Sequence, residues 1–358
     1  ILNYGNTDSF AEARDKIFTK LKEGRTQEVF ENIEKSLMPV IRKMEEVGIA
    51  VDVPYLQELG SKYHIELTRY EKKIWEYAGR EFNINSPKQL GEILFDEMML
   101  TAKGLKKTEG GARSTRESEL EKLKDSHPII EEIFRYRELQ KLLSTYIDTL
   151  PALVSGDGRL HARFNQAGTT TGRFSSSDPN LQNIPVKTEL GKKIRDAFVA
   201  QKGFELVSLD YSQIELRIAA LLSQDEFLTQ VFADGKDVHS AVAMKVFGVS
   251  EGDVTQEMRR RAKVINFGIL YGMGVNALKD ALGTDRKEAQ IFYDNYFEQF
   301  PKIEGYLDGV IEEVKNNGYT TTLFGRRRYF PGIRSPLPFI KAMAERMAIN
   351  APIQGTSA

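Results

Sequence analysis

The sequence contains no cysteine among its 358 residues. This absence excludes disulfides, thiolate metal sites and a cysteine nucleophile, and it fits a reducing compartment. Only four histidines occur, so a zinc centre is not expected. The chain lacks a run of eighteen apolar residues, which argues against a membrane-spanning helix. It opens at Ile1 without a basic segment followed by an apolar one, so no signal peptide is predicted.

An excess of charge is also missing, because 50 Lys and Arg residues stand against 51 Asp and Glu residues, giving a formal net charge of −1. Any attraction to a polyanion must therefore come from local patches. Two nucleotide-binding motifs can be set aside. Gly272–Ala277 imitates a dinucleotide-binding loop but follows a predicted helix instead of a strand, and the P-loop pattern does not occur.

The length predicts two or three units with their own cores. Apolar periodicity and turn residues predict the coarse order of elements. Helices are expected from Val29 to about Gly48, over Leu56–Ala78 and over Lys341–Ile349, with Asn350–Pro352 stopping or kinking the last one. Strands are expected at Ile49–Val51, Arg159–Phe164 and Phe204–Leu209, and a hairpin with a basic tip at 319–330.

The most informative stretch is Arg259–Tyr271. If it is helical, Arg259, Lys263, Phe267 and Tyr271 recur every four residues and form one stripe, cationic first and aromatic second. Such a stripe suits a nucleotide lying along the helix, with its phosphates on the cations and its base against the rings. The alternative is an amphipathic core helix with a solvated basic end.

Two polar segments also allow two interpretations each. The linker Thr101–Arg116 carries Lys103, Lys106, Lys107, Arg113 and Arg116, and either solvates a surface or touches a phosphate backbone. The segment TTTGRFSSSDPNLQNIP (169–185) is either a long disordered connector or a functional loop around Arg173 and Phe174.

Asp210 ends the predicted strand, and a helix is expected to begin directly after it. A carboxylate at such a junction can stand exposed on a rigid backbone, which suits a metal ligand. Ser212 and Glu215 have the spacing of a capping box. The alternative makes Asp210 a turn residue and Glu215 a capping partner.

Four segments together resemble the family A DNA polymerases, the bacterial DNA polymerase I group, from about Val29 onward. They are TTTGRFSSSDPNLQNIP, then LDYSQIELR (209–217), RRRAKVINFGILYG (259–272) and NAPIQGT (350–356). The resemblance implies an α+β right-hand fold, mostly helical with a small antiparallel palm sheet. It divides the chain into an exonuclease-like remnant (1–27), an entry into the palm (28–50), a thumb (51–150), palm (151–210), fingers (211–340) and an incomplete return to the palm (341–358).

The resemblance implies a DNA-directed DNA polymerase that adds deoxynucleoside triphosphates to a primer 3′ end. Two Mg²⁺ ions, for which Mn²⁺ is a possible substitute, would stabilise the attacking and leaving oxygens. Asp210 would bridge both ions, and the Tyr211 carbonyl would complete one shell. Arg259 and Lys263 would hold the triphosphate with help from His239, and Lys263 is placed to act as general acid.

The same resemblance assigns the remaining contacts. Phe267 would pack on the sugar and base, and its being Phe instead of Tyr implies discrimination against dideoxynucleotides. Tyr271 would hold the template-side position. Glu215 would occupy the place of a ribose 2′-hydroxyl and so exclude ribonucleotides. Contacts to primer-template DNA fall to these residues: Arg173, Gln213 and Gln354 at the primer or minor groove, with Asn180, Gln182, Asn183, Lys106, Lys107 and Arg113.

Both ends depart from the family pattern. The third polymerase motif, a His-Asp-Glu with the second metal-bridging carboxylate, does not occur before Ala358, so we expect the chain as given to bind nucleic acid weakly and not to extend a primer. Tyr4–Asp8 matches the Y-x-x-x-D of a proofreading exonuclease, and a helix N-terminus explains it equally well.

Two other functions remain open. A single-subunit RNA polymerase shares the broad architecture, although Glu215 and Gln213 argue against it. A non-catalytic nucleic-acid-binding fragment is the second alternative. The expected partners are primer-template DNA and deoxynucleoside triphosphates, with no membrane, and a monomer in the cytoplasm of a bacterium or a phage-infected cell is predicted.

Overall fold

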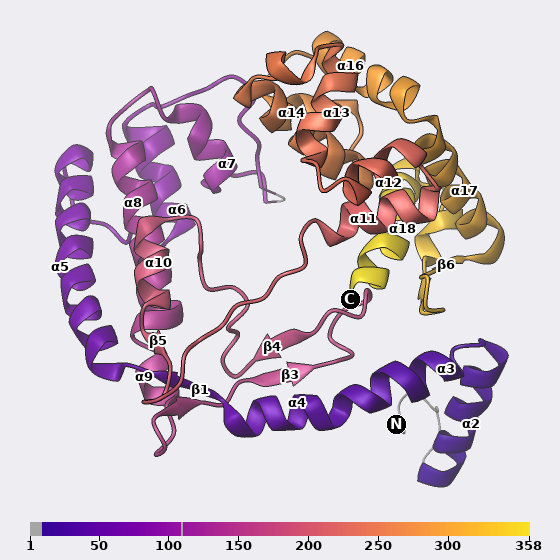
Figure 1. Cartoon of the computed structure of the whole chain (residues 1–358). Helices are drawn as coiled ribbons and strands as arrows, with labels where there is room; N and C mark the ends of the chain where they lie inside the picture. Colours follow the sequence, from indigo (N-terminus) through magenta and orange to yellow (C-terminus); the bar gives the residue numbers. More distant parts are fainter. Residues whose placement is uncertain (1–8, 109) are drawn as a thin grey trace. The chain divides into compact units, whose positions relative to one another are not determined.

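The structure is a computed structural model that describes residues 9–108 and 110–358. Its residues form two compact units. The first contains the described part of Ile1–Ile41 with Asn165–Ser175 and Ser208–Ala358, and the second contains Arg42–Phe164 with Ser176–Val207. Neither unit is one continuous stretch of sequence, because the chain passes between them several times. Helices predominate in both units (Figure 1).

The second unit holds the small antiparallel sheet and most of the early helices. In chain order its elements are β1 (Ile49–Val51), α5 (Val53–Ala78), α6 (Pro87–Gly91), η2 (Glu92–Glu97), α7 (Glu117–Leu120), η3 (Glu121–Leu123), α8 (Ile129–Leu142), η4 (Leu143–Ile147), α9 (Leu150–Leu153), β2 (Arg159–Leu160), α10 (Glu189–Arg195) and β5 (Phe198–Val199). The helix α4 (Lys35–Val47) leads into it, and β3 (Arg163–Asn165) pairs with β4 (Ser175–Ser177) where the two units divide the chain.

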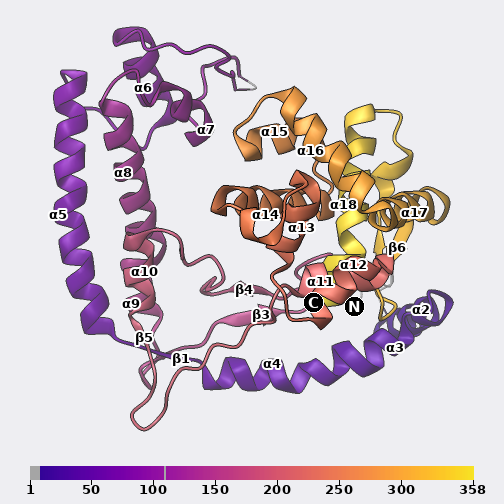
Figure 2. The same ribbon diagram turned by 45° about the horizontal axis from the view of Figure 1, so that its top comes forward.

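The long helix α5 organises the second unit. Asp52 caps its N-terminus, Pro54 stands in its first turn, and Gly79 ends it in the left-handed conformation. It runs beside α8, and this pair of helices is visible in both views (Figures 1 and 2). The three-stranded sheet has the order β2-β1-β5, with Ile49 opposite Leu160 and Ala50 opposite Val199. The predicted strand at 49–51 and helix at 56–78 are confirmed.

The first unit is a helical assembly with one hairpin. Its elements are α2 (Phe10–Glu23), α3 (Gln27–Val29), η1 (Phe30–Glu34), α11 (Ile214–Ser223), α12 (Glu226–Ala233), α13 (Val238–Phe247), η5 (Glu251–Asp253), α14 (Gln256–Leu270), α15 (Val275–Leu282), α16 (Arg286–Gln299), α17 (Pro301–Asn317), β6 (Tyr319–Thr321), β7 (Arg327–Tyr329), η6 (Pro331–Arg334) and α18 (Pro338–Ser357). The predicted hairpin is confirmed, with Tyr319 paired to Tyr329.

The larger core of the first unit joins α11 to α17, and a smaller one lies among α17, η6 and α18. The larger core contains the fully buried Phe300 together with Val242, Ile265 and Tyr296. The helices α13 and α14 pack side by side in this core (Figure 2). A helix with one apolar stripe buries that stripe in the core, so its polar face is exposed to solvent. The burial of these side chains therefore sets which face of each helix is accessible.

The strand predicted at Phe204–Leu209 is wrong. This segment has no regular secondary structure, and it belongs to none of the sheets of the described residues. Phe204, Val207 and Leu209 are 72%, 76% and 92% exposed. An apolar run becomes a strand only when its backbone groups find a partner ladder, and sequence alone does not show whether the partner is there.

One predicted helix end is also wrong. Of the predicted stop or kink at Asn350–Pro352, the stop does not occur, because α18 continues through Pro352 to Ser357. Its last turns contain the buried residues Ile353 and Gly355, and this burial offsets the backbone hydrogen bond that Pro352 does not donate.

None of the helices in residues 9–108 and 110–358 is both long and apolar enough to cross a membrane.

Candidate active site

The helix α14 presents the predicted stripe on an accessible face. Thr255 caps its N-terminus by accepting a hydrogen bond from the Met258 amide at 3.1 Å. The buried residues of α14 are Ala262, Ile265, Asn266, Gly268, Ile269 and Leu270. This burial leaves Lys263 exposed, while Phe267 packs partly against the core, an arrangement that an amphipathic core helix with a solvated basic end also has.

The four stripe residues differ in exposure along the helix. Lys263 is exposed, Phe267 is half-buried and Tyr271 is 45% exposed. The Phe267 and Tyr271 ring centroids lie 6.2 Å apart at an interplanar angle of 36°. Two accessible rings one turn beyond two cations have the order expected of a nucleotide-binding surface.

Arg259 is held by a carboxylate that the sequence did not reveal. Its Nε and Nη2 donate to the Asp237 carboxylate at 2.8 and 3.0 Å. Asp237 also caps α13 by accepting from the Ser240 amide and hydroxyl at 2.9 and 2.6 Å. Burial works to raise the pKa of Asp237, but the hydrogen bonds from Arg259 and Ser240 outweigh it and hold the pKa well below its usual range. Asp237 is therefore an anion beside the stripe.

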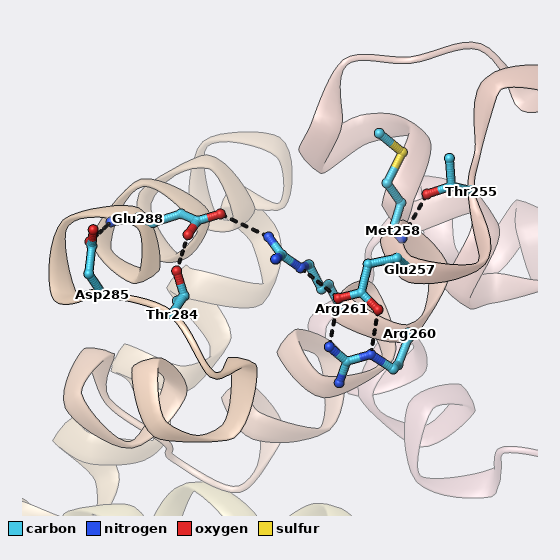
Figure 3. A network of polar contacts seen from close by, with 8 residues as sticks. All are labelled: Thr255, Glu257, Met258, Arg260, Arg261, Thr284, Asp285 and Glu288. Carbon is cyan, nitrogen blue, oxygen red and sulfur yellow. Dashed lines mark hydrogen bonds and ion pairs between the residues drawn. The ribbon is translucent and has the colours of Figure 1, made fainter.

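The two arginines that follow Arg259 are occupied elsewhere (Figure 3). Arg260 forms a two-bond ion pair with Glu257 at 2.7 and 2.6 Å. Arg261 donates to Glu257 at 2.9 Å and to Glu288 of α16 at 2.8 Å. Hydrogen bonds from Arg260 and Arg261 lower the pKa of Glu257 to about 2. These contacts fasten the first turn of α14 to α16 and leave Arg259 and Lys263 as the cations of the stripe.

His239 lies under the aromatic end of this surface. It is 3% exposed, and its ring centroid is 5.8 Å from that of Phe267. Its Nδ1 lies 3.4 Å from the Asn266 amide nitrogen. Burial lowers the pKa of His239, so the ring is neutral near pH 7. As placed here, it supports Phe267 and carries no charge.

Glu215 is the buried carboxylate of the site. It is 7% exposed and accepts a hydrogen bond from the Tyr271 hydroxyl at 2.6 Å and one from the Arg173 guanidinium. Burial and the bond to Glu215 raise the pKa of Tyr271 to about 12. The predicted capping box is wrong. Gln213, in the left-handed conformation, is the N-cap residue of α11, and the Glu215 side chain turns toward Arg173 and Tyr271 instead.

Asp210 and Tyr211 precede α11 on an extended segment, and both are exposed. Carboxylate and carbonyl oxygens are the ligands that Mg²⁺ prefers, and an exposed carboxylate is reachable by a hydrated cation, so these residues fit part of a magnesium shell. Within the described part of the chain, no group of three or more acidic or His residues is arranged to hold a metal ion.

A cavity of about 450 Å³ lies beside Tyr271. Its lining comes from the hairpin and α18: Arg328, Met343, Arg346, Met347, Asn350 and Gln354. The Asn350 Nδ2 is buried without a hydrogen-bond partner among the described residues. Arg346 and Asn350 were missed by the sequence analysis, although they precede Gln354 at four-residue spacing on one helix, a signal that was available.

The other predicted DNA-binding residues belong to the second unit. Lys106, Lys107 and Arg113 are exposed on the 101–116 loop, as are Asn180, Gln182 and Asn183 on the later segment. The loop is folded rather than extended, because Lys107 and Arg113 form a β-bridge and Arg113 pairs with Asp96 and covers the Phe95 ring at 4.9 Å. The exonuclease-like match at Tyr4–Asp8 lies outside the described residues.

Comparisons with known proteins identify the family of the chain. Residues 53–358 match the model of DNA polymerase family A, and the chain belongs to this family. A thermostable DNA polymerase I from Thermus thermophilus is 49% identical over 96% of this chain and 42% of its own length. DNA polymerase I from Bacillus subtilis is 47% identical over 96% of the chain and 39% of its own length.

A solved structure has a similar fold. The polymerase domain of Pol1 from M. smegmatis, in complex with DNA primer-template and dNTP, superposes with a TM-score of 0.89 and is 38% identical, over 97% of this chain and 61% of that one. This likeness confirms the expected α+β right-hand polymerase fold. The chain spans about two fifths of the length of the curated relatives named here.

Proposed function

We propose that this chain carries the nucleotide-binding part of a DNA-directed DNA polymerase, which transfers a deoxynucleotide to a primer 3′ end as the template directs. The observation that carries this proposal is the accessible stripe on α14, where Arg259 and Lys263 precede Phe267 and Tyr271. The membership of family A supports it, as does the relative whose structure contains primer-template DNA and dNTP.

The cationic half of the stripe would bind the triphosphate. Lys263 is exposed and one turn from Arg259, so both can contact phosphate oxygens at once. Lys263 would also donate a proton to the leaving pyrophosphate. His239 is buried and neutral, so it would contribute a hydrogen bond or support for Phe267 rather than a charge.

The acidic segment before α11 would hold the metal. Asp210, with the Tyr211 carbonyl, would bind Mg²⁺ or Mn²⁺, which would stabilise the attacking and leaving oxygens of the transfer. The exposure of Asp210 supports this assignment, because a ligand must be reachable from solvent.

Glu215 would select the sugar. The carboxylate is fixed by Arg173 and Tyr271, and a fixed buried group excludes an extra hydroxyl more strongly than a mobile one does. Gln213, at the start of α11, would contact the primer or minor groove.

The cavity beside Tyr271 would hold the template-side nucleotide. Arg346 and Arg328 offer charge for a phosphate, and Asn350 and Gln354 offer amides for a base edge. In the second unit, Lys106, Lys107 and Arg113 would contact the phosphate backbone, with Asn180, Gln182 and Asn183 adding polar contacts.

Primer extension tests this function. With Mg²⁺, a primer-template and each nucleotide in turn, we expect extension with deoxynucleotides and little with ribonucleotides. Lys263→Ala should abolish most of it, whereas Lys287→Ala, an exposed lysine on α16, should not. Efficient use of ribonucleotides would favour an RNA polymerase, and DNA binding without extension would favour a non-catalytic module. We also propose that the protein acts as a monomer in the cytoplasm, where its DNA substrate lies.

A further inference from the structure

The Asp237 carboxylate accepts hydrogen bonds from Arg259, the residue to which the proposed function assigns a nucleotide phosphate. Asp237 binds the Nε and Nη2 edge of the guanidinium with two parallel hydrogen bonds, at 2.8 and 3.0 Å. This is the same two-point geometry in which arginine binds phosphate oxygens. The side chains of Arg259 and Asp237 are 40% and 34% exposed, so an incoming anion can reach the pair.

The pair belongs to the stripe and is not buried scaffolding. Asp237, Arg259 and Lys263 all act electrostatically on His239, which lies beneath Phe267. Lys263 lies one turn along α14 from Arg259, which Asp237 binds directly, so a phosphate bound by both cations would approach the Asp237 carboxylate. Like charges at such distances repel, and the repulsion grows with the charge of the ligand.

We infer that Asp237 is an internal competitor for the phosphate-binding arginine. Its carboxylate occupies Arg259 when no nucleotide is bound, so a polyphosphate must displace it or share the guanidinium. The exchange weakens the binding of triphosphate and of the product pyrophosphate, and it speeds the release of pyrophosphate. This inference rests on the proposed function, because it concerns the phosphate site assigned there.

Asp237 is well placed to return after the ligand leaves. The Ser240 amide and hydroxyl hold Oδ2 at 2.9 and 2.6 Å, independently of Arg259. Displacement therefore moves the arginine side chain and leaves the carboxylate on α13. The competitor stays in position through each binding event.

Glu288 of α16 provides a matched control, because it pairs with another arginine of α14. It pairs with Arg261 at 2.8 Å and, like Asp237, links α14 to a neighbouring helix (Figure 3). Arg259 and Arg261 are two positions apart, which places them about 200° apart around the helix axis. Glu288→Gln thus removes one charge and one ion pair of α14 without touching the stripe.

The test is isothermal titration of the full chain with dATP, inorganic pyrophosphate, dAMP and deoxyadenosine. Asp237→Asn keeps an N-cap residue for α13 and removes the charge. We expect it to tighten binding of dATP and pyrophosphate by about tenfold, equivalent to ~1.4 kcal/mol. The gain should be smaller for dAMP and absent for deoxyadenosine, and Glu288→Gln should change none of them.

The double variant Asp237→Asn with Arg259→Ala distinguishes competition for Arg259 from direct electrostatic repulsion between the Asp237 carboxylate and the phosphate. If Asp237 acts by occupying Arg259, the gain should largely disappear in the Arg259→Ala background. Unchanged or weaker dATP binding by Asp237→Asn, with Arg259→Ala still weakening it, would overturn this inference alone. If Arg259→Ala binds dATP as tightly as the wild type does, the assignment of Arg259 to the phosphate site is wrong, and the inference about Asp237 is wrong as well.

Discussion

The Tyr271 hydroxyl donates a 2.6 Å hydrogen bond to the Glu215 carboxylate, which joins the C-terminal end of α14 to the first turn of α11. The guanidinium of Arg173 reaches the same carboxylate from the loop before β4. One buried acid therefore ties three segments of the first unit together, and each of the three matches a separate motif of the sequence. Loss of any partner affects both stability and the site.

Replacing Tyr271 with Phe removes the hydroxyl and keeps the ring. We expect the free energy of unfolding to fall by about 0.5–1.5 kcal/mol, the usual net contribution of one hydrogen bond. Urea denaturation measures this change. Tyr211→Phe is the control, because that side chain is 79% exposed. Equal effects of the two substitutions would show that the bond to Glu215 contributes nothing to stability.

Replacing Glu215 with Ala in the complete enzyme should raise ribonucleotide incorporation by about tenfold or more, because the space for a 2′-hydroxyl opens. Primer extension with paired deoxy- and ribonucleotides measures the ratio. Glu215→Gln keeps the size of the side chain and should retain most of the exclusion. Unchanged sugar selection by the alanine variant would remove this role from Glu215.

Replacing Gly355 with Ala should destabilise the first unit. A Cβ atom at this position would lie 2.7 Å from the Thr322 Cγ2 and 3.1 Å from the Thr171 carbonyl oxygen, so α18 and the hairpin would have to move apart. We expect a loss of about 1–3 kcal/mol in the free energy of unfolding.

The control for this substitution is Gly309→Ala within α17, where nothing lies within 4 Å of the added Cβ. Alanine there should stabilise the chain by up to about 1 kcal/mol, since alanine has the higher helix propensity. Thermal or urea unfolding of the two variants should therefore shift in opposite directions. A shift of both in the same direction would contradict the close approach at Gly355.

The ion pairs of Glu257 predict a particular acid dependence. Its pKa is lowered from 4.5 to about 2 by hydrogen bonds from Arg260 and Arg261. A lowered pKa stabilises the folded state above pH 4.5, and the contribution is lost as the pH falls toward 2. The stability difference between the wild type and Glu257→Gln should therefore be constant from neutral pH to about pH 5 and shrink below pH 4.5.

Unfolding by urea at a series of pH values measures this difference. Added salt should reduce it at neutral pH, because the pairs are at the surface. A difference that stays constant down to the lowest pH at which the chain folds would show that the pairs in Figure 3 do not form in solution.

Local patterns predicted the parts of the fold that depend on neighbours in sequence. The four-residue spacing of Arg259, Lys263, Phe267 and Tyr271 placed them on one helical stripe, as α14 shows. The strand at 49–51, the helix over Leu56–Ala78 and the hairpin at 319–330 followed from the same kind of signal. These features depend on the repeat of side-chain direction along a helix or strand, which spans only a few residues and can be read from the sequence.

Contacts between distant residues were not readable in this way. The spacing of Ser212 and Glu215 predicted a cap, but Glu215 bonds to residues 42 positions before it and 56 positions after it. Phe204–Leu209 had the pattern of a strand and lacks a partner in the described residues. In each case the outcome depends on what lies opposite in space.

The sequence by itself determined the family, through four motifs, and the order of cations and rings along one helix. Only the tertiary structure decided how far each residue of this stripe is exposed, that Asp237 pairs with Arg259 and that Arg260 and Arg261 pair with Glu257 and Glu288. The physical reason is that helix periodicity is a local property of the chain, whereas the partner of a charged side chain is chosen by packing between helices.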